Sequence, residues 1–210
     1  YRYGFTGTLD GTQTHKWVLE GLFGPSYKII STKKLQDAGY LAKLNIKVLL
    51  MKHNPQKFDT YEDEVQYIIN HDKRNNFIKN LAHDLKGNTL ILYSRVATHG
   101  QVLFDLINIG NRKVFFVHGG VDAQEREEVR RITETEKDAI IVASFGTFST
   151  GINIKNLHNI IFASPSKSRI RTLQSIGRVL RKGNNKISAT LFDIADDTKK
   201  GSRNNYTLNH

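Results

Sequence analysis

The sequence predicts an α/β fold in which a parallel sheet is flanked by helices. Two observations predict it: short apolar runs with the length of buried strands alternate with longer stretches of helical period, and the alternation fills the second half of the 210-residue chain. Such alternation gives a parallel sheet because right-handed crossovers need helices to return the chain. We expect strands at 89–93, 113–117, 139–143, 159–163 and 188–193, and helices near 97–109, 123–134 and 169–181.

The first 40 residues look like the tail of a preceding domain. A short helix is expected over 14–23, where Gly24 and Pro25 stop it, followed by a strand over 27–30 and a helix over 33–38 capped by Ser31. A strand-like run over 45–51 is then broken at 53–56. We therefore assign residues 1–40 to a first domain and residues 41–60 to the crossing between two domains.

Residues 61–195 are assigned to the second, main domain. Its first part, 61–85, has helical period and reads as two helices that meet near His71 and Asp72. The last segment, 196–210, is polar and rich in Asn and Lys, so we expect it to fray from Asp196 onward.

Charge is distributed unevenly. The chain carries 31 Lys and Arg against 20 Asp and Glu, a net charge of +11. Residues 139–192 contain no acidic residue at all. An excess of this kind is typical of a surface that meets a polyphosphate, either a nucleic-acid backbone or a nucleotide.

Other features exclude several classes of site. Cysteine is absent, which excludes disulfides and thiolate zinc sites and favours a reducing, cytoplasmic setting. The eight histidines show no pattern that places two on one face, so we expect no metal site. No apolar run approaches the length of a membrane span, and we expect no membrane partner.

One helix carries a stripe of fixed cations. Over 168–181 the apolar residues Ile170, Leu173, Ile176 and Leu180 recur at helical spacing, and Arg171, Gln174, Arg178 and Arg181 recur on another face. Arginine stays charged and offers a rigid fork of donors to phosphate oxygens. Gly177 leaves room on this helix for a close partner. The alternative is an ordinary amphipathic helix with a solvated basic face.

Hydroxyls and glycines follow two of the expected strands. Ser144, Thr147, Gly151 and Asn153 come after the strand at 139–143, and Ser94 and Arg95 end the strand at 89–93. Ligands of open parallel sheets bind outside the carboxyl ends of the strands, so these residues are placed to touch one. The alternative is that they only form turns or an exposed loop.

The order of these blocks resembles superfamily-2 helicases. Residues 174–181, Gln-Ser-Ile-Gly-Arg-Val-Leu-Arg, resemble motif VI, and 144–154 resemble motif V. Residues 88–95 resemble motif IV, 117–126 the segment between motifs IV and V, and 4–9 motif III. The resemblance implies a RecA-like second motor domain preceded by the tail of the first.

The resemblance also implies residue roles. Arg178 and Arg181 would meet the terminal phosphate of ATP. Gln174, Gly151 and Asn153 would contribute to the nucleotide site, although the family commonly has Asp where this chain has Asn153. The nucleic-acid backbone would be contacted by Ser94, Arg95, Ser144 and Thr147. Thr6 and Thr8 would couple the nucleotide state to strand movement.

Two elements of an ATP site are missing from the sequence. No Gly-Lys dipeptide occurs, so a phosphate-binding P-loop cannot exist here. The Asp63-Glu64 pair lies in a stretch of helical period rather than after a buried strand, so we do not expect it to hold Mg²⁺. The resemblance then implies that ATP and Mg²⁺ are held mainly by a missing N-terminal half, and that this chain alone does not hydrolyse ATP.

The expected function is that of the C-terminal motor domain of an ATP-dependent DNA helicase. Resemblance to phage recombination and repair helicases implies branched DNA substrates, namely forks, Holliday junctions and R-loops with their RNA–DNA hybrid, in the cytoplasm of an infected bacterium. Three alternatives stay open: a double-strand translocase, a non-catalytic nucleic-acid-binding module, and a Rossmann-like enzyme that uses His118, Gly119 and Gly120 for a cofactor phosphate.

Overall fold

A single parallel sheet organises the chain. The computed structural model describes residues 2–6, 12–151, 154–166, 168–181, 186–199 and 206–208. Six strands pair in the order β1-β6-β5-β2-β4-β3, all parallel. The strands are β1 (Lys43–Lys52), β2 (Thr89–Tyr93), β3 (Val114–Val117), β4 (Ile140–Ser144), β5 (Asn159–Phe162) and β6 (Ser188–Asp197). The predicted α/β sheet with parallel strands is confirmed.

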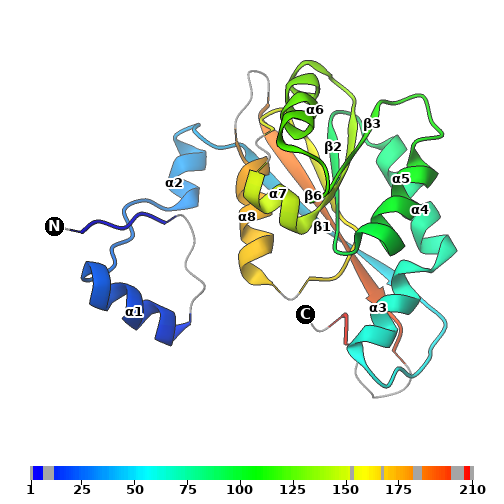
Figure 1. The fold of residues 1–210 in the computed structure, drawn as a ribbon, viewed down its shortest axis with the longest axis horizontal. Helices are drawn as coiled ribbons and strands as arrows, with labels where there is room; N and C mark the ends of the chain where they lie inside the picture. The colour runs from blue at the N-terminus through cyan, green and yellow to red at the C-terminus, as the bar shows by residue number, and fades with distance from the viewer. Residues whose placement is uncertain are drawn as a thin grey trace.

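Helices cover both faces of this sheet (Figure 1). The helices that follow β1 are α3 (Tyr61–Ile69), α4 (Asp72–Asp84), the π-helix η1 (Val96–Gly100), α5 (Gln101–Ile107), α6 (Ala123–Thr135), α7 (Phe145–Gly151) and α8 (Arg169–Val179). Two further helices, α1 (Gln13–Phe23) and α2 (Thr32–Asp37), precede β1. The helix expected over 97–109 is therefore two segments. Gly100, at their junction, lies so close to the Tyr93 ring that an added Cβ would overlap it.

Two apolar clusters form the core, one on each side of the sheet. Leu90 and Leu92 of β2 point to the cluster that contains Phe148 of α7 and Val179 of α8. Ile91 and Tyr93 point to the cluster that contains Ile78 of α4 and residues of α5. Alternate side chains of a strand point to opposite faces, so an apolar run is needed where helices cover both.

Strand β1 lies in the segment expected to cross between domains. It pairs with β6 along its whole length, from Lys43 opposite Ser188 to Lys52 opposite Asp197. It is one of the two edge strands, and its side chains are less buried than those of the inner strands: Ile46, Val48 and Leu50, on one of its faces, are exposed.

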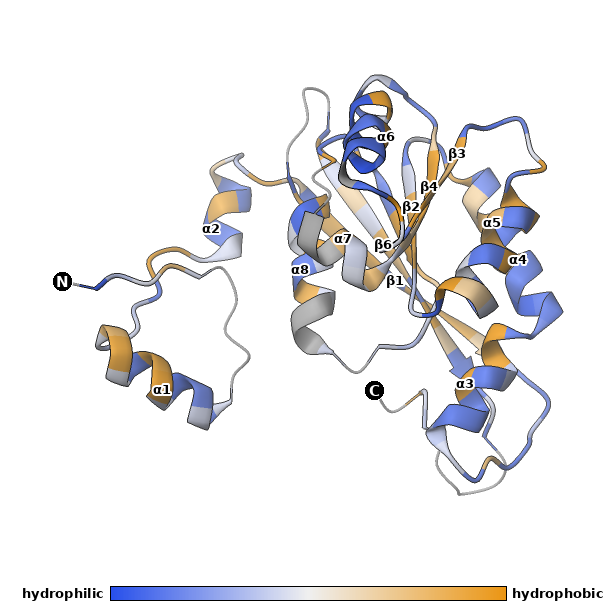
Figure 2. Cartoon of the chain, viewed as in Figure 1, coloured by the Kyte–Doolittle hydropathy of each residue, from blue (hydrophilic) through white to orange (hydrophobic). Residues whose placement is uncertain are grey.

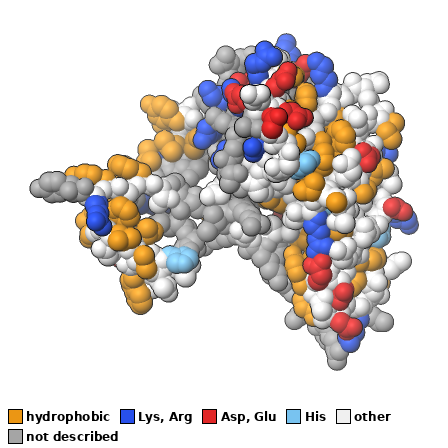
Figure 3. Space-filling view, in the orientation of Figure 1, with side chains coloured by type: hydrophobic (Ala, Val, Ile, Leu, Met, Phe, Trp, Pro, Cys, Tyr) orange, Lys and Arg blue, Asp and Glu red, His pale blue; other side chains and the backbone are white. Residues whose placement is uncertain are grey.

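The N-terminal segment lies apart from the sheet in Figure 1. Helices α1 and α2 have no buried residues. Several large apolar side chains of this segment are exposed, including Phe5, Trp17 and Ile29. Figure 3 shows hydrophobic side chains, in orange, gathered over this segment, and Figure 2 shows hydrophobic stretches of ribbon in α1. The strand expected over 27–30 is wrong, because these residues have no neighbouring strand to pair with in the described part of the chain.

The expectation that the chain frays from Asp196 is wrong at Asp196 and Asp197. Both belong to β6, and Asp196 is buried. Further along, Thr207 is buried as well, and its amide and hydroxyl donate hydrogen bonds to Glu64. None of the described helices is long and apolar enough to cross a bilayer.

Candidate functional site

Helix α8 presents the stripe of cations at the edge of the sheet. Arg181 and Gln174 are exposed, and Arg178 is half-buried. Burial, and then the charge of Arg181, lower the pKa of Arg178. The end of α8 lies at the amino end of β1, since the amide of Ala42 donates to the carbonyl of Leu180 at 2.9 Å.

The packing face of α8 differs in part from the expected one. Ser175, Val179 and Leu180 are buried and Ile176 is half-buried, whereas Leu173 is 41% exposed. Val179 belongs to the core cluster around Leu90 and Leu92 and Ile176 packs against it, whereas Leu173, nearer the start of the helix, is not part of this cluster. The side chains of Ile170 and Arg171 lie outside the described residues.

A buried lysine holds the C-terminal end of α8. Lys186 is 2% exposed, and its Nζ donates to the carbonyl oxygens of Val179, of Arg181 at 3.2 Å and of Lys155 at 3.4 Å. Carbonyls at the end of a helix lack partners within the helix, and a cation there satisfies them. Burial lowers the pKa of Lys186 to about 8. No pattern in the sequence singles out this role of Lys186.

Ser144 and Thr147 bond to each other at the start of α7. The Ser144 hydroxyl donates to Thr147 Oγ1 at 2.8 Å and accepts from the Thr147 amide at 3.2 Å, and both residues are buried. This is the pattern of a side chain that caps a helix start. The rest of the expected loop site, Asn153 and the surroundings of Gly151, lies outside the described residues.

Ser94 and Arg95 lie at the carboxyl end of β2, beside the carboxyl end of β4. Tyr93 is in register with Ser144, so the two loops are neighbours. Ser94 is exposed, and Arg95 forms an ion pair with Glu62 of α3, a contact that lowers the pKa of that carboxyl group.

A second layer of polar groups supports this edge. The Ser94 amide donates to Ser164 Oγ at 3.2 Å, and the same oxygen lies 3.0 Å from Nδ1 of the fully buried His99. Burial lowers the pKa of His99 to about 3, so the ring is neutral at ordinary pH. Neither Ser164 nor His99 was predicted, and no pattern in the sequence singles them out.

The predicted residues therefore form two surfaces rather than one site. Ser94, Arg95 and Ser144 lie at the carboxyl edge of the sheet, whereas Arg181 is bridged to Leu41 at the amino end of β1. Thr6 is exposed in the N-terminal segment, and Thr8 lies outside the described residues.

Comparison with known proteins places this arrangement in a family. The model of the helicase conserved C-terminal domain matches residues 72–183, more than half of the chain. The chain belongs to the helicase C-terminal domain family.

Among relatives of this helicase domain is the ATP-dependent DNA helicase uvsW of Enterobacteria phage T4, which is 36% identical over 229 residues. The match covers 100% of the chain but 45% of the relative, so the chain spans less than half of that protein. The crystal structure of T4 UvsW superposes with a TM-score of 0.67 at 35% identity, covering 90% of this chain and 40% of that one.

A more distant structure has the same fold. The ATP-dependent Type ISP restriction-modification enzyme LlaBIII, solved bound to DNA, matches with a TM-score of 0.58 at 16% identity, over 82% of this chain and 13% of that chain. The fold is that of RecA-like second domains, as predicted.

The Asp63-Glu64 pair of this helicase domain has structural roles. Asp63 completes the capping box of α3 with Thr60. Glu64 is fully buried and accepts hydrogen bonds from the Thr198 hydroxyl, the Tyr206 and Thr207 amides and the Thr207 hydroxyl. Within the described residues, no group of three or more His, Asp or Glu is arranged to hold a metal ion.

Proposed function

We propose that this chain is the second motor domain of an ATP-dependent superfamily-2 DNA helicase. In this proposal Arg178 and Arg181 reach a triphosphate held mainly by another half of the same polypeptide. The observation that carries it is the cation stripe on α8, in which Arg181 is exposed and Arg178 is half-buried, on a helix whose end is fixed by Lys186. Gly177 supports it, because an added Cβ there meets no described atom within 4 Å, which leaves space for a closing partner.

The chemistry proposed for the arginines is electrostatic. A guanidinium group positioned against the γ-phosphate stabilises the charge that develops as the phosphoryl group is transferred. Gln174, Gly151 and Asn153 are proposed to complete the nucleotide site. Mg²⁺ and most phosphate contacts come from the other half, because this sequence has no P-loop. We therefore expect no ATP hydrolysis from this chain alone.

The carboxyl edge is proposed to carry one strand of nucleic acid. Ser94 and Arg95 are placed for contact with the phosphate backbone, and Arg95 would exchange its Glu62 partner for a phosphate. Contact of a phosphate with Ser144 or Thr147 requires their mutual hydrogen bond to open. Backbone contacts carry little sequence information, so binding should be sensitive to salt and tolerant of sequence.

The biological setting is proposed from the relationship to T4 UvsW. We propose branched DNA as the substrate, including forks, Holliday junctions and R-loops with an RNA–DNA hybrid, in recombination and repair in the cytoplasm of an infected bacterial cell. Residues 1–40 are proposed to belong to the first motor domain, where Thr6 and Thr8 would couple nucleotide state to strand movement.

Substitution of the arginines in the intact protein tests the proposal. Arg178→Ala and Arg181→Ala should each lower ATP turnover about 100-fold or more, and leave DNA affinity within a few-fold of the original. Arg131→Ala on the exposed surface of α6 is the matched control and should change neither. Unchanged turnover in both arginine variants would remove the motor proposal. Release of a labelled strand from a fork by the intact protein separates a helicase from a double-strand translocase.

A further inference from the structure

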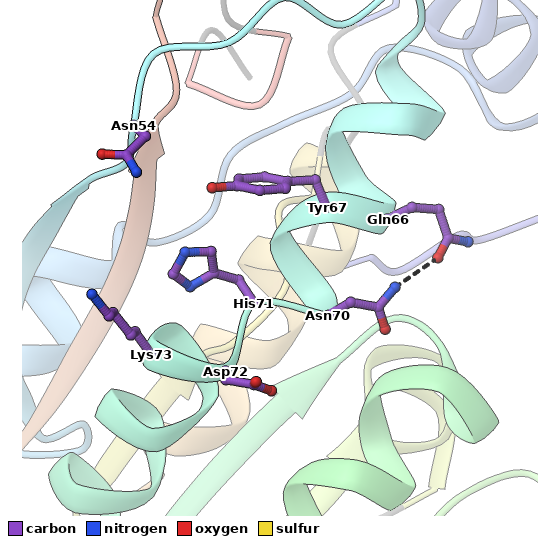
Figure 4. A pocket seen from close by; sticks show the side chains of 7 residues that line it. All are labelled: Asn54, Gln66, Tyr67, Asn70, His71, Asp72 and Lys73. Atoms are coloured by element: carbon purple, nitrogen blue, oxygen red, sulfur yellow. Dashed lines mark hydrogen bonds between the residues drawn. The ribbon is translucent and has the colours of Figure 1, made fainter.

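The carboxyl ends of β1 and β6 carry a hollow that the proposed function does not use. It is lined by α3, by the start of α4 and by the segment after β1, with a volume of about 640 Å³. Figure 4 shows the Tyr67 and His71 rings beside one another, with Asn54 and Lys73 on one side and Asn70 on the other.

Aromatic rings form one side of the hollow. The Tyr67 ring centroid lies 5.4 Å from that of His71 and 5.6 Å from that of His53, in edge-to-face arrangements. Phe58 lies at 5.4 Å from Tyr67. Tyr67 and His71 are only half-buried, so part of each ring remains accessible. Rings held in this way offer apolar surface with a polar group at one end.

Buried polar contacts hold the rings in place. His53 Nε2 lies 2.8 Å from Asp196 Oδ1, and Arg74 Nε donates to the same carboxylate oxygen at 2.8 Å. His71 Nδ1 accepts the Arg74 amide at 3.3 Å, which leaves its Nε2–H as a donor. Burial, and then the neighbouring His53, lower the pKa of His71, so the ring is neutral at ordinary pH.

Helix α3 connects the hollow to the edge proposed to carry nucleic acid, because Gln66, which lines the hollow, donates a hydrogen bond to Glu62 at 3.4 Å. Glu62, in the first turn of α3, pairs with Arg95 after β2, and Tyr67 and His71 follow farther along the same segment. The amide groups of Asn54 and Asn70 and the ammonium of Lys73 also line the hollow. The amide of Gln66 and the carboxylate of Asp72 complete the lining. The hollow therefore combines an aromatic platform, hydrogen-bonding amides and one group of each charge, all outside the carboxyl ends of parallel strands.

We propose that the hollow binds an unpaired nucleobase of the strand whose backbone passes Ser94 and Arg95. The base stacks on the face of the Tyr67 ring and meets the edge of the His71 ring, because the two rings are inclined at 70° to each other. The amides bond to the edge of the base, and Lys73 meets an adjacent phosphate. Stacking accepts any base because every base has a π face. The inference rests on the proposed function and adds to it a preference for single-stranded over paired DNA.

The test uses the intact protein and a short single-stranded oligonucleotide that carries one fluorescent adenine analogue. Binding should quench the analogue, and Tyr67→Leu should weaken binding about tenfold and abolish the quenching. Tyr67→Phe should retain both, because the ring is kept. Lys73→Gln should keep the quenching and reduce the slope of log affinity against log salt by about one. Tyr27→Leu, at a side chain 82% exposed on the N-terminal segment, is the matched control.

The outcomes separate this inference from the proposed function. The first case is that the unsubstituted protein binds the oligonucleotide and that a melting curve shows Tyr67→Leu to be folded. If Tyr67→Leu then binds the oligonucleotide and quenches the analogue as well as the unsubstituted protein does, the base site is overturned and the motor proposal stands. If the melting curve shows that Tyr67→Leu is unfolded, the other two variants decide. Quenching retained in both Tyr67→Phe and Lys73→Gln, together with a lower salt slope in Lys73→Gln, supports the base site. An unchanged salt slope in Lys73→Gln overturns the base site. If the original protein binds no DNA at all, both proposals fail.

Discussion

The Nζ atom of Lys186 lies 3.2 Å from the carbonyl oxygen of Arg181, so a buried ammonium fixes the end of the helix that carries the cation stripe. Lys186→Met keeps the length of the side chain but removes the donor from the carbonyls of Val179, Arg181 and Lys155. We expect the free energy of unfolding in urea to fall by about 1–3 kcal/mol.

The same lysine predicts a pH dependence. Its pKa is lowered from 10.5 to about 8 in the folded chain. Below pH 8 the folded and unfolded states both hold the proton, and between about pH 8 and 10.5 the unfolded state holds more. The free energy of unfolding should therefore gain a positive slope with pH in this window, and the slope should be smaller in Lys186→Met. Equal slopes for the two proteins would contradict the assignment.

Replacement of Gly177 by alanine should stabilise this chain but lower the activity of the intact protein. In this chain Gly177→Ala should raise the free energy of unfolding by up to about 1 kcal/mol, because alanine favours a helix and the added Cβ meets no described atom within 4 Å. In the intact protein the same change should lower ATP turnover, since the methyl group occupies space needed for closure. Turnover unaffected by Gly177→Ala would mean that no partner closes on this face.

Glu64 should anchor the C-terminal residues. Glu64→Gln places an amide group opposite the amides of Tyr206 and Thr207, and we expect a loss of about 2–4 kcal/mol in the free energy of unfolding. Hydrogen exchange at Thr207 should become faster. Glu62→Gln, at an exposed carboxylate in the first turn of α3, is the control and should leave the free energy of unfolding nearly unchanged. Comparable losses in both variants would argue against an anchor.

His99 should make the chain sensitive to acid. Its pKa is lowered from 6.5 to about 3 by burial, so the unfolded state takes up a proton below pH 6.5 while the folded state does not until about pH 3. The free energy of unfolding should fall through this window by up to about 1.4 kcal/mol per pH unit. His99→Gln should lose this part of the slope, which urea titrations between pH 7 and 5 measure. His15→Gln, at an exposed position of α1, should keep it.

Much of the fold could be predicted because it depends on local periodicity. The apolar runs over 89–93 and 139–143 became strands buried on both faces. In such strands the pattern along a single element decides which side meets apolar neighbours. In α8 the helical spacing predicted the packing side only in part, because Leu180 is buried but Leu173 is exposed and Arg178 is half-buried. The one-sided charge of residues 139–192 is likewise a property of the sequence.

Only the tertiary structure decided which buried polar groups meet. Asp196 was assigned to a fraying tail because Asp, Asn and Lys surround it, yet it pairs with Arg74, 122 residues away. Glu64 finds the Tyr206 amide 142 residues away, and His99 finds Ser164 65 residues away. Periodicity records which face of an element is apolar, but a buried charge is stable only beside its particular partner. That partner is brought close by the order of strands in the sheet, which no local pattern contains.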